Sequence, residues 1–500
     1  MAEPFHAPPL LYGALGAAVS YYGVSFLSRK DGLPWLLGIL LVMGILGSLM
    51  QVLAQHPTLF GKALRTYRHV RRYRVYSITL ILGFSLGLGV GNQVKPLWFG
   101  IPEDQIRGIY GTLKEDPRAF HDSRGMGYLA LQNVSGKGGL RASAAGTLRV
   151  FFPEGTIPRL QEFGRGSEVY LEGTIRTSEP KTKTAGTLGK YFQAQSVHLL
   201  RPAPALEQLR TRGHSALMKR FSSEPWGGLA GALLLGVKDQ LDTELSQAYQ
   251  YAGCSHVLAL SGMHLAILTA VLALFLRRPL GLKAAALLGG CCILGYVYLV
   301  GNLPSLERAA IMYLLGTLAV LGSLPKQGSA LLSLAFLLQI LLRPESGQSI
   351  SFILSYLALA GILSVGNPIH VLIQGRIPEV LAKPLAASLG AFIATAASTV
   401  CFFGVLRPIG ILAGLIIVPL TTLFMLGALA ALILPGNYLG LILSFLYDVL
   451  MRLVSLAAQV PGIPVLDTLV VAALSLGVSG ALMVLSHRQT LMRSNLVPFA

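Results

Sequence analysis

Long apolar stretches constrain this chain more than any other feature of its sequence. The stretches 39–53, 79–91, 265–275 and 411–434, with their apolar flanks, approach or exceed the roughly 18–20 residues needed to cross a bilayer core. Only 12% of the 500 residues are charged, against about 25% in soluble proteins. A segment in lipid must satisfy its own backbone groups, which favours helices. The sequence therefore predicts a polytopic α-helical membrane protein with about 12 spans.

Basic residues between the apolar stretches predict the orientation. Lysine and arginine number 40 against 22 acids, and cytoplasmic loops carry such an excess. The loop 61–74 holds six basic residues and no acid. We expect three spans before residue 95, at 10–27, 33–54 and 76–94, with both termini in the cytoplasm. Nine more are expected at 254–276, 284–301, 305–323, 328–342, 348–366, 385–406, 409–433, 438–460 and 467–486.

The segment 96–203 has a different character, because it lacks long apolar runs and is rich in turn residues. β-Branched and aromatic residues predict five strands, at 106–113, 127–134, 146–152, 167–175 and 191–200. Five strands in about 100 residues favour a small barrel, with an OB-like fold as one candidate. Tyr110, Tyr128, Phe152 and Tyr170 either stack on nucleic-acid bases or fill the core.

These patterns divide the chain into five parts. The segment after the barrel alternates apolar and basic residues and is too short to span, so we expect it at the outer membrane interface or re-entrant. The expected parts are a three-helix membrane segment 1–95, an extracytoplasmic OB-like β domain 96–203, an amphipathic interfacial or re-entrant region 204–252, a membrane domain 253–487 and a cytoplasmic tail 488–500.

Sequence signatures of zinc proteases and of nucleotide-binding loops are missing from the 500 residues. They contain no HExxH and no Walker loop, and Ala259 stands where the first glycine of a GxSxG motif around Ser261 would be. The four cysteines lie in apolar segments without CxxC spacing, which favours neither a disulfide framework nor a thiolate site. We therefore expect no catalytic residue, no metal and no cofactor.

Polar residues interrupt the stretch "GCSHVLALSGMHLAIL" at 253–268. His256, Ser261 and His264 are costly in lipid and need a reason. Gly262 beside Ser261 favours a local helix break, as in the discontinuous helices that line transport sites. The alternative is that both histidines only form interhelical hydrogen bonds.

A second polar stretch is "GNLPSLERAAIM" at 301–312. Ser305 is expected to cap a helix, with Arg308 in its first turn. A cation there opposes the helix dipole, so Arg308 either pairs with Glu307 or another acid, or faces an aqueous cavity that suits an anionic substrate. The alternative is an interfacial arginine that extends its charge into water.

Two further groups of polar residues lie in later spans. Ser351 and Ser355 are one turn apart and either line a pathway or join helices. Asp448 and Arg452 are four apart, acid first, which predicts a structural ion pair within one helix.

Together these stretches resemble the ComEC family of bacterial competence proteins. The block 231–268 is similar to the family's "HLLAISGLHV" region through Leu235, Gly236, Asp239, Gly253, His256, Leu258, Ala259, Ser261, Gly262 and His264. The block 301–312 is similar to its "G…PS..RA.IM" pattern through Gly301, Pro304, Ser305, Arg308, Ala309 and Met312. Two looser matches follow at 343–362 and 404–420.

The sequence also departs from the family pattern. Arg343 stands where an acid is usual, Gly414 where an asparagine is common, and Glu307 is an additional charge beside Arg308. The 500 residues contain no segment that resembles the metallo-β-lactamase-like domain of longer family members, so we expect a form without its own nuclease.

The resemblance implies a channel in the bacterial inner membrane that translocates single-stranded DNA during natural transformation. It places the barrel outside, where it meets DNA first. Expected partners are DNA, membrane lipids, a separate nuclease, a DNA receptor, a cytoplasmic motor or helicase, and a second copy of the chain. His256, Ser261, Gly262, His264, Ser305, Arg308, Ser351 and Ser355 would form the DNA pathway. The alternative function is a secondary transporter or a lipid-handling membrane protein.

Overall fold

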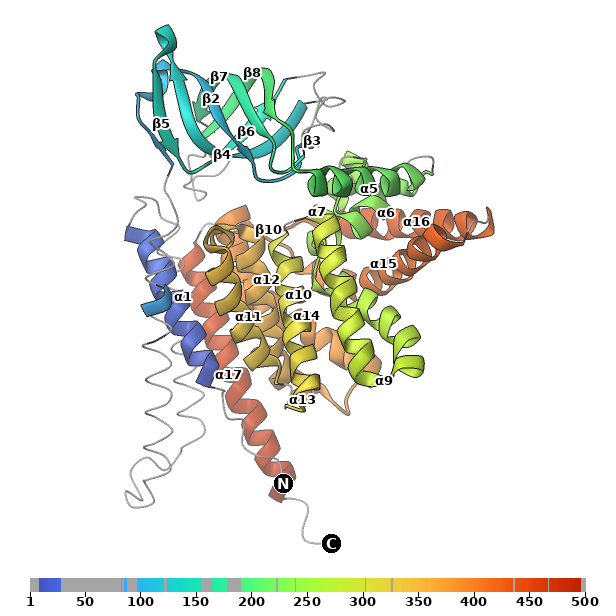
Figure 1. The fold of residues 1–500 in the computed structure, drawn as a ribbon. Coiled ribbons are helices and arrows are strands. Elements are labelled where there is room, and N and C mark those ends of the chain that lie inside the picture. Colours follow the sequence, from blue (N-terminus) through green and yellow to red (C-terminus); the bar gives the residue numbers. More distant parts are fainter. Residues whose placement is uncertain are drawn as a thin grey trace.

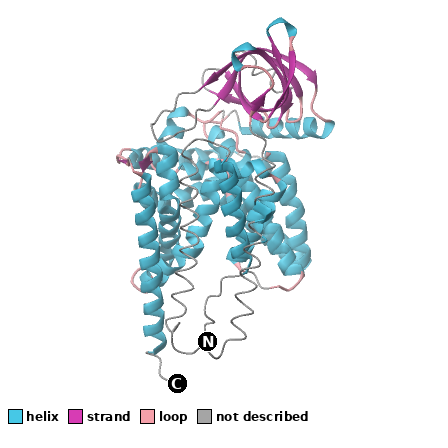
Figure 2. Cartoon of the chain, turned by 90° about the vertical axis from the view of Figure 1, so that its left-hand side faces the viewer, coloured by secondary structure: helices cyan, strands magenta, loops and turns pink. Residues whose placement is uncertain are grey.

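The computed structural model consists of a β-barrel above one end of a helical bundle (Figures 1 and 2). It describes residues 9–27, 82, 85–87, 97–120, 124–153, 164–177, 190–221, 224–238, 240–301, 303–324, 327–434, 437–465 and 467–495. The expected spans 33–54 and 76–94 and the basic loop 61–74 lie wholly or almost wholly outside these residues. The expected count of 12 spans therefore stays a prediction.

The barrel contains all five predicted strands. Its strands are β1 (Trp98–Phe99), β2 (Ile106–Leu113), β3 (Arg118–Phe120), β4 (Arg124–Gly136), β5 (Arg141–Ala145), β6 (Thr147–Phe152), β7 (Glu168–Thr177) and β8 (Lys190–Arg201). Five of them close the barrel in the order β4-β2-β7-β8-β6 and back to β4. Only β6 and β8 are parallel in this ring. The prediction of a small OB-like barrel is confirmed.

The barrel core forms from the inward side of each strand, as the alternating pattern requires. Ile109, Leu129, Val150, Val169 and Phe192 have no exposed surface. The sequence missed β5 because its residues, RASAA, include none of the β-branched or aromatic types that favour strands.

The aromatic residues of the barrel divide between its two sides. Phe152 is buried in the core, whereas Tyr110, Tyr128 and Tyr170 are half-buried and alternate with inward-facing neighbours along their strands. Core packing therefore accounts for one of the four rings that the sequence singles out.

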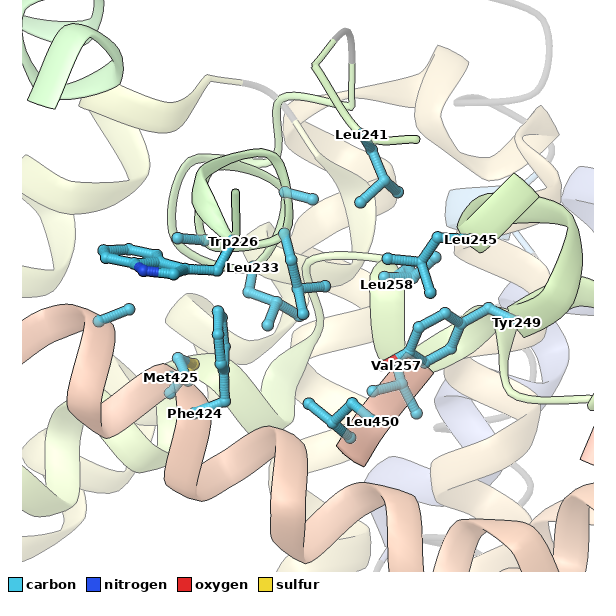
Figure 3. Packing of buried hydrophobic residues seen from close by; sticks show 14 of the residues in the cluster. Trp226, Leu233, Leu241, Leu245, Tyr249, Val257, Leu258, Phe424, Met425 and Leu450 are labelled. Atoms are coloured by element: carbon cyan, nitrogen blue, oxygen red, sulfur yellow. The ribbon is translucent and has the colours of Figure 1, made fainter. Parts of the chain in front are cut away.

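Short helices connect the barrel to the bundle. They are α5 (Ala205–Phe221), α6 (Gly227–Leu235), α7 (Thr243–Tyr251) and α8 (Ser255–Leu258). Figure 1 shows α5 between the barrel and the bundle. All residues of α6 except Gly228 are buried. They belong to the large core cluster in Figure 3, where Trp226, Leu233, Tyr249 and Phe424 pack together.

The bundle contains long apolar helices, as the sequence predicts. Its elements are α1 (Pro9–Leu27), α9 (Gly262–Val300), α10 (Pro304–Leu321), α11 (Gly328–Leu342), α12 (Ile350–Gly361), the π-helical turn Ile362–Gly366, α13 (Asn367–Ile373), α14 (Glu379–Phe403), α15 (Ile409–Ile433), α16 (Asn437–Ala458) and α17 (Thr468–Asn495), with a small β9–β10 pair (Val405–Leu406 and Ile463–Pro464). In the described part of the chain, seven helices are long and apolar enough to cross a membrane. The polytopic helical fold class is confirmed.

Helix α9 contains two helical halves. Pro279 lies inside it, and Gly281 has a φ of 75° and a ψ of 173°. A proline removes a backbone donor and a glycine tolerates the positive φ, so the helix breaks there. The two halves correspond to the separate spans predicted at 254–276 and 284–301, except that the first half begins later, at Gly262.

A charge network centred on the buried Arg210 joins the barrel to the bundle. Arg210 of α5 donates to Asp116 in the β2–β3 loop at 2.6 Å and to Glu207 at 2.7 Å. Its Nη1 also donates to the Leu299 carbonyl of α9 at 3.2 Å. Arg165, which precedes β7, pairs with Glu207 at 2.7 Å. The charges of two arginines and two acids thus compensate one another where the barrel, α5 and α9 meet.

Candidate functional site

The two specific sequence blocks meet at an interruption between helices. Helix α8 ends at Leu258, residues 259–261 are not helical, and α9 starts at Gly262. The N-terminal end of α10 packs against this segment, because Leu260, Leu265, Leu306 and Ala310 share one buried cluster. The break expected beside Gly262 therefore forms, and it lies next to Ser305 and Arg308.

Ser261 and His264 cap the first turn of α9. The Ser261 hydroxyl accepts from the Met263 N–H at 3.3 Å, and Nδ1 of His264 accepts from the Ser261 N–H at 3.1 Å. This reciprocal arrangement is a capping box. It satisfies backbone donors that the helix leaves free.

The hydrogen bonds of His264 fix its tautomer. Because Nδ1 accepts a backbone N–H, the proton lies on Nε2. The His264 side chain is buried, with 2% of the residue exposed, and Nε2 has no hydrogen-bond partner in the described part of the chain. The Ser261 Oγ lies 3.1 Å from Nδ1, but no carboxylate of a described residue bonds to the ring, so this pair has no third member of a catalytic triad among those residues.

Ser305 stabilises the interrupted segment from the neighbouring helix. Its hydroxyl donates to the Leu260 carbonyl at 2.8 Å, a group that the break would otherwise leave unpaired. The expectation that Ser305 caps α10 is wrong. The helix starts at Pro304 with Leu303 as its N-cap, since proline is well suited to the first helical position.

Arg308 lies in the second turn of α10 and is buried, with 8% of the residue exposed. Its Nη1 donates to the Ser355 carbonyl of α12, and its guanidinium lies 5.7 Å from the ring centroid of Tyr356. Its Nε has no hydrogen-bond partner among the described residues. Pairing with Glu307, one of the alternatives for Arg308, does not occur, and no other described carboxylate forms a salt bridge with Arg308.

Gly262 provides the space in which the Arg308 side chain lies. A Cβ at this position would stand 3.1 Å from Nη2 of Arg308 and 3.3 Å from Cβ of Ala309. The glycine of the first block thus permits close approach of the arginine of the second block.

The sequence singles out Glu307 and Arg343 but misses the contact between them. It also misses Gln339 and Tyr356. Glu307 pairs with Arg343 at 2.6 Å, and Gln339 donates to Glu307 at 3.2 Å. The Tyr356 hydroxyl donates to Gln339 at 2.8 Å. Glu307 and Arg343 are the two charged departures from the family pattern, and each compensates the charge of the other. The opposite signs of these two unusual charges were the sequence signal from which the ion pair could have been predicted.

Other predicted site residues lie apart from this group. His256 on α8 and Ser351 on α12 are exposed, whereas Arg308 is buried. Asp448 and Arg452 are exposed on α16, and the predicted ion pair between them is not formed. In the described part of the chain, no three His, Cys, Asp or Glu side chains are grouped as metal ligands.

Sequence comparison gives the family of this chain. The family model described as "Competence protein" matches residues 233–490, which is just over half of the 500 residues. The chain belongs to the competence protein family. The match includes the break, the Arg308 group and every long helix from α9 to α17.

Two curated relatives match parts of the chain. ComE operon protein 3 of Bacillus subtilis (strain 168) is 33% identical over 137 residues, which are 26% of this chain and 17% of that protein. An uncharacterized protein of Aquifex aeolicus (strain VF5) is 25% identical over 266 residues, which are 53% of this chain and 59% of that protein. The chain therefore spans less than two thirds of either relative.

Proposed function

We propose that this competence-family membrane protein translocates single-stranded DNA across the bacterial inner membrane during DNA uptake. The route runs through the membrane domain 253–487, past the junction of α8, α9 and α10. The barrel 96–203 is on the outer side, both termini are in the cytoplasm, and the region 204–252 lies at the outer interface. Membership in the competence family supports the biological role.

The observation that carries this proposal is a pair of buried hydrogen-bond donors without acceptors. Nε of Arg308 and Nε2 of His264 are both donors, and both are unpaired among the described residues. A buried donor without a partner costs roughly 1–3 kcal/mol. A phosphate supplies acceptor oxygens and the negative charge that Arg308 lacks among its described neighbours. The junction therefore suits a polyanion.

We assign the proposed lining of the pathway with this geometry as support. Ser261, Gly262 and Ser305 hold the interrupted segment, Arg308 and His264 offer donors, and Ser355 holds Arg308 through its carbonyl. His256 and Ser351 are exposed and would contact a strand only outside this junction. A separate nuclease, a DNA receptor and a cytoplasmic motor are the proposed partners.

Uptake of labelled DNA in a naturally competent host tests this function. Deletion of the gene should block entry of label into the cytoplasm and leave label bound at the cell surface. Unchanged entry would overturn the proposal and favour a transporter of small molecules or lipids. Restoration by a plasmid copy is the control for effects on neighbouring genes.

A further inference from the structure

Three aromatic rings form a row across the outer side of the barrel. Tyr110 of β2 lies directly opposite Tyr170 of β7, and Tyr170 lies directly opposite His198 of β8. Their inward-facing neighbours, among them Ile109 and Val169, are buried in the core. Because side chains alternate along a strand, the three rings point outward.

The rings lie face to face. The centroids of Tyr110 and Tyr170 are 4.3 Å apart with 28° between the planes, and those of Tyr170 and His198 are 6.1 Å apart with 26° between the planes. The guanidinium of Arg141 lies 5.2 Å from the Tyr110 centroid. Aromatic pairs in cores often meet edge to face, whereas this row is parallel throughout.

Gly108 gives the row its space. A Cβ at this position would stand 2.5 Å from the Tyr170 hydroxyl oxygen and 2.6 Å from its Cε2. The phenol end of Tyr170 therefore occupies the space beside a glycine of the adjacent strand.

One end of the row is covered and the other is open. Arg141 covers Tyr110, whereas His198 is exposed, and Leu199 and Leu200 beside it are 39% and 56% exposed. Strand β6 pairs with β8 only at Tyr191–Gln193. Among the described residues, no strand covers the edge beside His198.

Charge around the row is mixed. Arg107 and Arg141 are exposed and form no salt bridge in the described part of the chain. Glu172 accepts from Ser196 at 2.9 Å, and Glu168 lies 3.8 Å from Arg201. Two arginines without a salt bridge among the described residues favour a phosphate backbone at the Arg141 end, while the two acids disfavour a site built on charge alone. Flat rings are therefore the main feature that a ligand would meet.

We infer that the row Tyr110–Tyr170–His198 is a stacking site for the bases of single-stranded nucleic acid. An incoming base extends the row on the exposed face of His198, and the strand's phosphates pass near Arg141 and Arg107. Every base has a π-face, so such a site is tolerant of sequence. The role of this site in DNA uptake rests on the proposed translocation function, but its affinity for single-stranded nucleic acid does not depend on that function.

Binding of fluorescent oligonucleotides to the full chain in detergent micelles tests the site. The probes are oligo(dT) and an abasic oligonucleotide of equal length and charge, measured by fluorescence anisotropy. Tyr170→Leu and His198→Ala should each weaken oligo(dT) binding about tenfold, as expected for loss of one stacked base, and leave abasic binding unchanged. Tyr128→Leu, which alters an outward-facing ring outside the row, is the matched control.

Two outcomes would overturn the site: equal affinity for the two probes, or unchanged oligo(dT) binding in both Tyr170→Leu and His198→Ala. His198→Ala removes an exposed side chain and should fold even if Tyr170→Leu does not. A DNA uptake assay separates the two proposals. If Arg308→Ala blocks uptake but the row variants bind normally, only the stacking site fails. If the row variants lose binding but gene deletion leaves uptake intact, only translocation fails.

Discussion

At the scale of single residues, Arg308 and Gly262 depend on one another. The sequence identifies both positions within the two specific blocks, but it does not show that they touch, because 45 intervening residues separate them. It also assigns Ser305 and Arg308 to the wrong helical positions. That assignment counts the helix from Ser305, whereas Pro304 occupies the first turn.

Gly262→Ala should destabilise the protein and displace Arg308. The added methyl group meets Nη2 at 3.1 Å and Ala309 at 3.3 Å, and overpacking typically costs about 1–3 kcal/mol. We expect a lower Tm in micelles and reduced DNA uptake. Gly295→Ala in the same helix, where no atom lies within 4 Å of the added Cβ, should be neutral or slightly stabilising. Equal Tm values for the two variants would contradict this account.

The ion pair of Glu307 and Arg343 should respond unequally to loss of either partner. The side chains are 11% and 44% exposed, respectively. Arg343→Ala leaves a buried carboxylate uncompensated and should cost about 1–3 kcal/mol. Glu307→Gln should cost less, because Arg343 reaches water and glutamine keeps a hydrogen bond to Gln339. Thermal unfolding of both variants measures the difference, and a larger loss in Glu307→Gln would show that the buried charge is not the cause.

At the scale of elements, the periodicity of apolar residues predicts which segments form strands and which form helices. Alternation located all five barrel strands, and hydropathy located the long helices. The capping box formed by Ser261 and His264 was not predicted, since glutamate or glutamine, and rarely histidine, occupies the third position of such a motif. The charge network of Asp116, Arg165, Glu207 and Arg210 was also missed, because its members come from three separate parts of the chain.

Arg210→Gln should loosen the contact between barrel and bundle. The Arg210 and Glu207 side chains are 2% and 11% exposed, and breaking a buried pair by removing one partner costs about 3–5 kcal/mol. We expect faster amide hydrogen exchange in α5 and the β2–β3 loop, with the barrel strands unchanged. Arg212→Gln, an exposed arginine two residues further on the same helix, should leave exchange as in the parent protein. Equal protection in the two variants would show that the network does not hold the barrel.

At the scale of the whole molecule, the fold class and the family follow from sequence, but the arrangement of the chain in the membrane needs a measurement. Loop charges predict the orientation, and the structure places the barrel at one end of the bundle (Figure 1). Gly139 belongs to an exposed turn of the barrel, and Lys283 lies beside the Gly281 break in α9.

Cysteine labelling tests the orientation. In a variant without the four native cysteines, Gly139→Cys should react with a membrane-impermeant maleimide on intact spheroplasts. Lys283→Cys should react only after permeabilisation. The reverse pattern would place the barrel in the cytoplasm and overturn the proposed direction of transport.

The central claim is that an anionic strand passes Arg308 within the membrane domain. Uptake of labelled DNA into the cytoplasm, measured at equal protein abundance, tests it most directly. Arg308→Ala should lower uptake at least about tenfold, since a charge-assisted contact is typically worth about 1.5–3 kcal/mol. Arg308→Lys keeps the positive charge and should therefore retain part of the DNA uptake. Uptake by Arg308→Ala equal to that of the parent protein would contradict the account.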